Sequence, residues 1–250
     1  MNHLFRRLSR SFWIVAIATL ALAHFAWMRL RRQLTLAERA RWLQKYNRRL
    51  LPHLGVRFEI EGVIPPTGLI ASNHLSYLDI LVYSAAMGCS FVSKAEVRSW
   101  PLFGPFARLT GTVFVWRHSA TDSVRAYGEL TRCLKTGHPV MLFPEGTTTD
   151  GTGVLPFRST MFQAAIDAGV PVTPATIGYT MAEGSVANDI CFWGEMEPLP
   201  HAWNLFSKDG IECRVRFGGP LAMEGDRKRI AKLAYQWVQR AATVAAVAES

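Results

Sequence analysis

An uninterrupted apolar segment near the amino terminus, Ser11 to Met28, constrains what this chain can fold into. The segment contains no Asp, Glu, Lys or Arg, and His24 is its only ionisable side chain. As a helix rising about 1.5 Å per residue it would measure about 27 Å, close to the roughly 30 Å hydrocarbon core of a bilayer. The segment therefore predicts a helix that enters a membrane.

Arginines flank this apolar segment on both sides: Arg6, Arg7 and Arg10 precede it, and Arg29, Arg31 and Arg32 follow it. Because both flanks are basic, the positive-inside rule assigns no orientation, and a helix that crosses the bilayer and one that re-enters it both remain open. A signal peptide is the alternative, with small residues near Ala21–Ala23 for cleavage. The arginines directly after the segment favour a retained anchor.

The next segment, Leu34 to Leu54, has the pattern of a basic amphipathic helix. Its apolar residues recur at helical spacing at Leu36, Ala40, Leu43, Leu50 and Leu54. Its bases occupy other faces, at Arg39, Arg41, Lys45, Arg48 and Arg49. With Trp42 and Tyr46, such a helix is expected to lie on an anionic lipid surface, the alternative being a helix packed on a folded domain.

Net charge separates these segments from the rest of the chain. The protein has a net charge of +9, but residues 1–50 carry +10 and the remainder is close to neutral. A protein that binds nucleic acid would spread basic residues over its folded surface, so no nucleic-acid partner is expected. We therefore expect a membrane anchor over residues 1–54 and a globular domain over residues 55–250.

The four cysteines lie far apart in sequence, at Cys89, Cys133, Cys191 and Cys213, without a CxxC pair. This spacing predicts buried thiols in a reducing compartment and neither a disulfide framework nor a metal site.

From about residue 56 short β-rich segments alternate with helical patterns, which predicts an α/β fold with helices on the faces of a sheet. Strands are expected at Val56–Gly62, Gly68–Ser72, Ser90–Ser93, Thr112–Trp116, Val140–Phe143, Val170–Gly178, Ile190–Trp193 and Cys213–Phe217. Helices are expected at Leu75–Met87, Pro101–Leu109, Ala120–Lys135, Phe157–Ala168 and Asp226–Val247.

Polar residues that could take part in a reaction follow two of the expected strands. The first leads into Asn73-His74, with Asp79 five residues after His74, in the expected first turns of a helix. A carboxylate bonded to one imidazole nitrogen leaves the other free as a base. The second leads into Glu145-Gly146-Thr147, where glycine and hydroxyl residues suit either a polar-headgroup site or an ordinary turn.

Together, NHLSYLD, GTVFVWR and FPEGTT resemble, in this order, the glycerolipid acyltransferase family, over about residues 56–220. The resemblance implies a mixed, mostly parallel sheet flanked by helices, behind an N-terminal membrane-anchoring helical segment. It implies that His74 deprotonates an acceptor hydroxyl that attacks an acyl thioester, and that Asp79 supports the histidine. It places substrate contacts at Asn73, Lys94, Arg117, Glu145, Gly146, Thr147 and Arg158.

The resemblance also implies the partners of the reaction. These are a lyso-lipid acceptor and acyl-CoA or acyl carrier protein, with no metal or redox cofactor, at the cytoplasmic face of the inner membrane. Bacterial 1-acyl-glycerol-3-phosphate acyltransferases are the first match, but Thr148 replaces an arginine usual after FPEGT, and Thr160 replaces a glycine. Lyso-ornithine-lipid acyltransferases are the alternative, and a non-catalytic lipid-binding protein is the second alternative.

Overall fold

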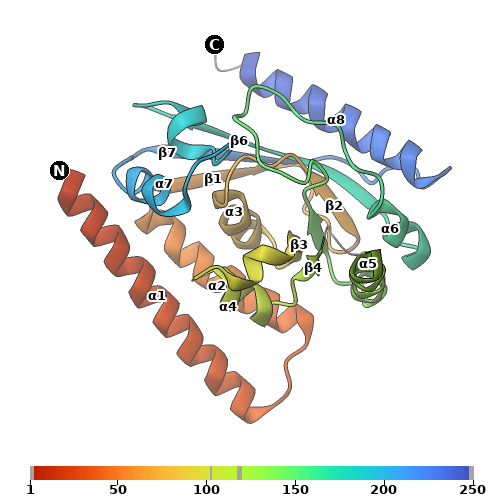
Figure 1. Ribbon diagram of the computed structural model, residues 1–250, viewed down its shortest axis with the longest axis horizontal. Coiled ribbons are helices and arrows are strands. Elements are labelled where there is room, and N and C mark those ends of the chain that lie inside the picture. The colour runs from red at the N-terminus through yellow and green to blue at the C-terminus, as the bar shows by residue number, and fades with distance from the viewer. Residues whose placement is uncertain (1–2, 102, 117–119, 248–250) are drawn as a thin grey trace.

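The computed structural model describes residues 3–101, 103–116 and 120–247, and its centre is a seven-stranded sheet with helices on both faces (Figure 1). The strands, in spatial order, are β1 (Val56–Glu61), β7 (Ile211–Phe217), β6 (Val172–Met181), β2 (Leu69–Ser72), β5 (Val140–Leu142), β3 (Ser90–Lys94) and β4 (Val113–Val115). From β6 to β4 all neighbours are parallel, whereas β7 is antiparallel to β6 and parallel to β1. The expected mixed, mostly parallel sheet is confirmed.

The α-helices are α1 (His3–Arg31), α2 (Leu36–His53), α3 (Leu78–Ala86), α4 (Phe103–Leu109), α5 (Ala120–Lys135), α6 (Phe162–Ala168), α7 (Pro198–Leu205) and α8 (Arg227–Val247). Two short turns complete the order, the 3-10 helix η1 (Ala95–Ser99) and the π-helical turn η2 (Val186–Ile190). The sequence pattern missed α7, although Pro198 stands at its start, where proline suits a helix.

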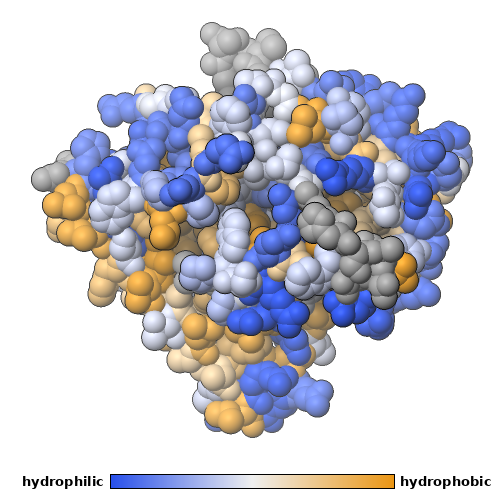
Figure 2. All heavy atoms as spheres, in the orientation of Figure 1, coloured by the Kyte–Doolittle hydropathy of each residue, from blue (hydrophilic) through white to orange (hydrophobic). Residues whose placement is uncertain are grey.

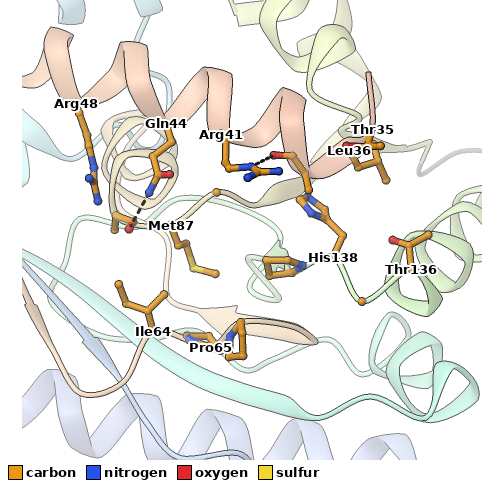
Figure 3. A pocket seen from close by; sticks show the side chains of 16 residues that line it. Thr35, Leu36, Arg41, Gln44, Arg48, Ile64, Pro65, Met87, Thr136 and His138 are labelled. Atoms are coloured by element: carbon orange, nitrogen blue, oxygen red, sulfur yellow. Dashed lines mark hydrogen bonds between the residues drawn. The ribbon is translucent and has the colours of Figure 1, made fainter. Parts of the chain in front are cut away.

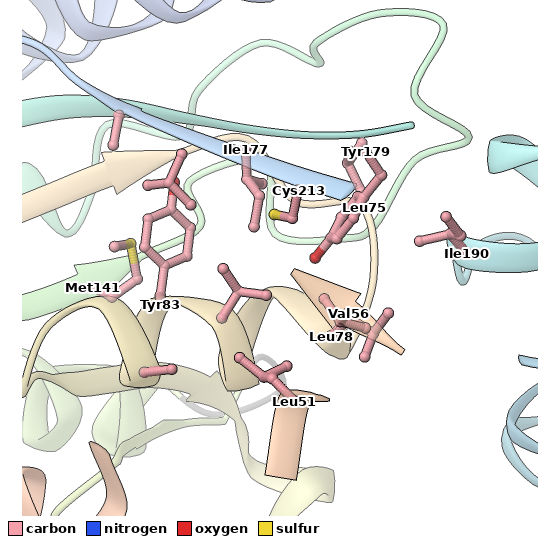
Figure 4. Packing of buried hydrophobic residues seen from close by; sticks show 14 of the residues in the cluster. Leu51, Val56, Leu75, Leu78, Tyr83, Met141, Ile177, Tyr179, Ile190 and Cys213 are labelled. Atoms are coloured by element: carbon pink, nitrogen blue, oxygen red, sulfur yellow. The ribbon is translucent and has the colours of Figure 1, made fainter. Parts of the chain in front are cut away.

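Both faces of the central strands are buried, as a sheet covered by helices requires. In β2, Ile70 points to the side of α3, whereas its neighbours Leu69 and Ala71 belong to the cluster under α5, α6 and α8. Figure 4 shows the first cluster, where Tyr83 and Leu78 of α3 lie near Met141, Ile177 and Cys213 of the sheet. The short apolar strands of the sequence are therefore interior strands. The four cysteines are free and buried, as expected.

The strand expected at Ile190–Trp193 is absent, and the prediction was wrong. Residues up to Ile190 form η2, and the amide of Phe192 donates to the carbonyl of Leu75 at 2.8 Å instead of joining a sheet. The helix expected from Phe157 begins only at Phe162, because the preceding residues form a loop held by the Arg158 amide on the Pro144 carbonyl. Both segments lie against the loops that follow β2 and β5.

The amino-terminal helices α1 and α2 lie side by side and pack against each other. The Trp42 indole donates to the carbonyl of Ala21 at 3.1 Å, and Trp42 and Tyr46 are 3% and 4% exposed. The helix expected over residues 34–54 is confirmed, but its apolar face packs on α1 and α3 and does not face lipid. The cause is that α1 supplies a large apolar surface for these rings to cover.

The exposed apolar surface of this region belongs to α1. The side chains that contribute to it are Leu4, Phe5, Leu8, Phe12, Trp13, Val15, Leu20, Leu22, Trp27 and Leu30. Figure 2 shows hydrophobic residues gathered on the side of the molecule where α1 lies. An exposed apolar face of this extent marks an interaction surface.

Arg6 and Arg10 hold the start of α1 on the folded body. The guanidinium group of Arg6 donates to the carbonyl of Ser207 at 2.7 Å. The guanidinium group of Arg10 is buried and donates to the carbonyls of Leu205, Phe206 and Lys208 at the end of α7, and it pairs with Asp209 at 3.3 Å. Burial lowers the pKa of Arg10, which Asp209 opposes. The contacts tie α1 to α7 as well as to α2.

Candidate active site

The first motif, NHLSYLD, and the second, FPEGTT, meet because the strands that precede them are parallel neighbours. β2 ends at Ser72, two residues before His74, and β5 ends at Leu142, three residues before Glu145. The carboxyl ends of parallel strands lie at one edge of a sheet, where ligands bind in open α/β folds. The backbone of the second motif reaches the first, since the Thr149 amide donates to the His74 carbonyl at 3.0 Å. The candidate site lies at this edge.

His74 and Asp79 form the dyad that the sequence predicted. The Nδ1 atom of His74 lies 2.8 Å from Oδ2 of Asp79, in the first turn of α3. A carboxylate only accepts hydrogen bonds, so Nδ1 carries the proton and Nε2 has a free lone pair. The His74 side chain is 17% exposed, whereas that of Asp79 is fully buried. The arrangement presents a base to an incoming ligand.

Three further donors hold the buried carboxylate of Asp79. The amides of Leu75 and Ser76 donate to Oδ2 at 2.7 and 3.0 Å, and the hydroxyl of Tyr179 donates to Oδ1 at 2.7 Å. A buried charge is tolerated when hydrogen bonds satisfy it. Tyr179 is on β6, a hundred residues from Asp79 in sequence, and no local pattern pointed to it. Burial is the main cause that raises the pKa of Tyr179 well above its ordinary value, and the negative charge of the nearby Asp79 adds to it.

The imidazole ring is also fixed by stacking. The rings of His74 and Phe143 have centroids 3.9 Å apart and an interplanar angle of 10°. Phe143 directly follows β5, so the strand before the second motif supports the base of the first. With one nitrogen bonded and one face covered, the ring has little rotational freedom.

The side chain of Asn73 bonds to the neighbouring strand β6, and the substrate contact expected of it stays a prediction. Its side-chain amide donates to the carbonyl of Ile177 at 2.9 Å, and its oxygen accepts from the amide of the same residue at 2.9 Å. The side chain thus adds two hydrogen bonds between the end of β2 and the strand β6, and Asn73 is only 4% exposed. It positions the loop that carries His74.

Glu145 also faces the protein. Its Oε1 accepts from the amide of His74 and its Oε2 from the amide of Leu155, both at 2.7 Å, and the residue is 3% exposed. Glu145 thereby links the His74 loop to the loop that follows β5, and the contact with the acceptor expected of it stays a prediction. Burial raises the pKa of Glu145 to about 7, against the effect of the two backbone hydrogen bonds.

Gly146 turns the chain after Glu145. It has a φ of 74°, and its amide donates to the carbonyl of Phe143 at 3.0 Å. Glycine adopts this left-handed conformation at little cost. Thr147, the next residue, is exposed and available to a ligand.

Two of the expected basic residues, Lys94 and Arg158, lie at the same edge of the sheet as the dyad. Lys94 ends β3, on the far side of β5 from β2, and is exposed. Arg158 is exposed, and its amide donates to the carbonyl of Pro144 at 3.0 Å, beside the Glu145 turn. Arg117 lies outside the described residues. In the described part of the chain no cluster of His, Cys, Asp and Glu could hold a metal ion.

The raised pKa of Glu145 predicts a pH-dependent stability. A carboxyl group whose folded pKa is about 7, against 4.5 for the free group, binds its proton more tightly in the folded state. The stability that this proton contributes is present below pH 4.5 and is lost as the pH rises towards 7. We expect wild type to lose about 3 kcal/mol of unfolding free energy relative to Glu145→Gln between pH 4.5 and 7.5.

Urea titrations of both proteins across this range measure the difference. The exposed Glu59→Gln variant is the control, because it makes the same chemical change on the surface of β1. A difference between wild type and Glu145→Gln that is constant with pH would contradict the prediction.

Comparisons with known proteins identify the family of the chain. The acyltransferase family model matches residues 55–178. A lyso-ornithine lipid O-acyltransferase of Brucella abortus is 42% identical over 66% of this chain and 67% of its own length. One from Pseudomonas aeruginosa is 33% identical over 94% and 93%. A 1-acyl-sn-glycerol-3-phosphate acyltransferase of Neisseria meningitidis is 38% identical over 56% of each chain.

A solved structure supports the fold. The 1-acyl-sn-glycerophosphate acyltransferase PlsC of Thermotoga maritima superimposes with a TM-score of 0.69 over 97% of both chains, at 20% sequence identity. The shared fold includes the mixed sheet and the apolar amino-terminal helix. On the extent and identity of these relatives, the chain belongs to the acyltransferase family.

Proposed function

We propose that the protein transfers a fatty acyl group from a thioester to the hydroxyl of a lyso-lipid, with His74 as the general base. The observation that carries the proposal is the hydrogen bond of 2.8 Å between His74 and the buried Asp79, which leaves Nε2 free at an exposed edge. A hydroxyl is a weak nucleophile at neutral pH, and a positioned base accelerates its reaction about 10²–10⁴-fold.

In the proposed reaction Nε2 of His74 removes the proton of the acceptor hydroxyl as its oxygen attacks the thioester carbonyl. The tetrahedral intermediate then expels the thiolate, which takes the proton from the imidazolium. The products are an ester and a free thiol, and the base is regenerated. Asp79 stabilises the imidazolium while it exists.

The donor and the acceptor contacts are part of the same proposal. Acyl-CoA or acyl carrier protein supplies the thioester, and this chemistry calls for no metal or redox cofactor. Lys94, Arg158 and the hydroxyl of Thr147 hold the polar headgroup of the acceptor, since they are exposed beside the dyad-bearing loops. Arg117, by its place in the motif, joins them.

For the acceptor we infer lyso-ornithine lipid. Thr148 stands where an arginine usually follows FPEGT, so one guanidinium group that could pair with a phosphate is missing. Relatives named for lyso-ornithine lipid also match over most of this chain, up to 94%. Lysophosphatidate is the second candidate, favoured by the cations of Lys94 and Arg158.

Parallel assays distinguish the two acceptors. Purified full-length protein is given acyl-CoA with lyso-ornithine lipid or with lysophosphatidate, and the release of free thiol is followed. We expect at least tenfold higher kcat/KM with lyso-ornithine lipid, because a single bidentate arginine contact is worth about that factor. Higher kcat/KM with lysophosphatidate would reverse the assignment, and thiol release with neither would contradict acyl transfer.

We also propose that α1 holds the protein on the cytoplasmic face of the inner membrane. α1 is long and apolar enough to cross a bilayer, and only 11% of its most apolar stretch is buried in the protein. Arg6 and Arg10 nevertheless tie its start to the end of α7, and Trp42 ties its middle to α2. A helix bonded along one side in this way presents its other, apolar side to lipid.

A further inference from the structure

A cavity of about 760 Å³ opens at the opposite edge of the sheet from the dyad. Its roof is α2, and its other walls are the segments that lead into β2, β3 and β5. Because those strands run away from it towards His74 and Glu145, the cavity is separate from the candidate active site. Figure 3 shows Arg48, Gln44 and Arg41 on α2 above Ile64 and Pro65.

Two arginines give the cavity a positive charge that nothing in its walls balances. The Nε atoms of Arg41 and Arg48 donate to the carbonyls of Ala37 and Ala85, at 3.3 and 2.7 Å. Within the described residues, the terminal nitrogens of both guanidinium groups have no hydrogen-bond or ion-pair partner, and no Asp or Glu lines the cavity. A guanidinium group held by Nε keeps its terminal nitrogens for a second, anionic partner.

A neutral imidazole, that of the buried His138, is among the lining residues of the cavity. Burial lowers the pKa of His138 to about 4, so the imidazole is uncharged at neutral pH. The hydroxyl of Ser90 donates to the carbonyl of Thr110 at 2.9 Å, so its oxygen accepts from Nε2 of His138 at 3.1 Å. Nδ1 is then unprotonated and can accept a hydrogen bond from a hydroxyl group.

Apolar side chains form the rest of the wall, among them Leu36, Ile64, Pro65 and Met87. Arg41 also lines a smaller cavity of about 220 Å³ between α1 and α2, together with Arg32, Lys45 and one acid, Glu38. The bases outnumber the acid there, so the positive surface continues to the helix with the exposed apolar face. The walls thus combine anion donors, a hydroxyl acceptor and apolar surface.

We propose that this cavity is a second ligand site, which binds a phosphate ester that carries a hydroxyl group, namely the headgroup of an anionic phospholipid. Arg41 and Arg48 hold the phosphate, Nδ1 of His138 accepts from the hydroxyl, and Ile64 and Met87 contact the glycerol carbons. The exposed face of α1 favours a lipid as the source of this chemistry over a soluble phosphate ester.

The test measures binding by calorimetry to the full-length His74→Ala protein, with dihexanoyl phosphatidylglycerol below its micelle concentration. Because this protein lacks the proposed base, the result does not depend on acyl transfer. We expect Arg41→Gln/Arg48→Gln to weaken binding at least 30-fold, since hydrogen bonds to charged groups are the strong ones. The control, Arg49→Gln, removes an exposed charge that lies over the Tyr46 ring, and should change binding less than twofold.

A second variant covers the case in which loss of the Arg48 contact with Ala85 affects folding. Ile64→Glu adds a negative charge at an exposed position of the cavity wall and leaves both arginines in place. It should also abolish binding. No binding to the His74→Ala protein, or equal losses in the Arg49→Gln control, would overturn the proposal.

Glycerol 3-phosphate and inorganic phosphate distinguish the possible sources. If both bind much more weakly than dihexanoyl phosphatidylglycerol, the result supports a lipid headgroup as the ligand. If glycerol 3-phosphate binds as tightly as the lipid, with the same dependence on Arg41 and Arg48, the site stands and its ligand is a soluble phosphate ester. Binding of all three that is unaffected by the arginine variants would overturn the site itself.

Discussion

His74→Ala is expected to lower kcat for thioester-dependent acyl transfer by about 10³-fold. The proposed base is removed, and a general base contributes about 10²–10⁴-fold. In the wild-type protein Asp79 and Phe143 hold the ring of this base in place. Binding to anionic vesicles should be unchanged, since the exposed apolar surface of α1 is untouched.

Release of free thiol from acyl-CoA, in the presence of lyso-lipid, measures the effect. His53→Ala is the matched control, because it removes an imidazole whose ring stacks on Trp13 at 4.1 Å and not on Phe143. Its turnover should stay within twofold of wild type. If His74→Ala also retained full turnover, His74 would not be the base, and a protein that binds lipid without catalysis would be consistent with intact vesicle binding.

Asp79→Asn is expected to lower kcat by about 10²–10³-fold while KM for both substrates changes less than threefold. An amide oxygen can still accept from His74, Leu75 and Ser76, so the fold of the loop is preserved. What is lost is the negative charge that stabilises the imidazolium formed during the reaction. KM should change little, because the Asp79 side chain is fully buried and out of reach of a substrate.

Tyr179→Phe is the companion to this variant. It removes the hydroxyl that donates to Asp79 and keeps the buried ring, so a smaller loss of about tenfold in kcat is expected. In the double variant with Asp79→Asn, the Tyr179→Phe change should lower kcat little further, since the charge that its hydroxyl contacts has already been removed. Losses that simply multiply would show that Tyr179 acts independently of Asp79.

Several features of the fold were predictable because they depend on nearby residues. The period of apolar residues located α1, α2 and most strands, and the order of strands and helices indicated an α/β sheet. The five-residue spacing of His74 and Asp79 indicated their contact, because a short loop and one helical turn bring the two side chains together. In each of these cases the chain itself limits how far apart the interacting groups can be.

Other roles depended on contacts between distant segments. The side chains of Glu145 and Asn73 bond to the backbone of the His74 loop, of Leu155 and of β6, contacts that the sequence did not predict. Motif residues of this kind look alike in sequence whether they bind a ligand or hold a loop. The hydrogen bonds that hold the loop form because β2, β5 and β6 are neighbours in the sheet.

The sequence by itself determined that an apolar helix starts this chain, that its positive charge is concentrated there, and that His74 and Asp79 meet. Tertiary structure decided that Tyr179 completes the site of Asp79, and that α2 turns its aromatic face to α1 instead of lipid. It also placed Arg41 and Arg48 over a cavity far from the dyad. The physical reason is that local geometry follows from covalent spacing, whereas long-range partners follow from which surfaces the sheet brings together.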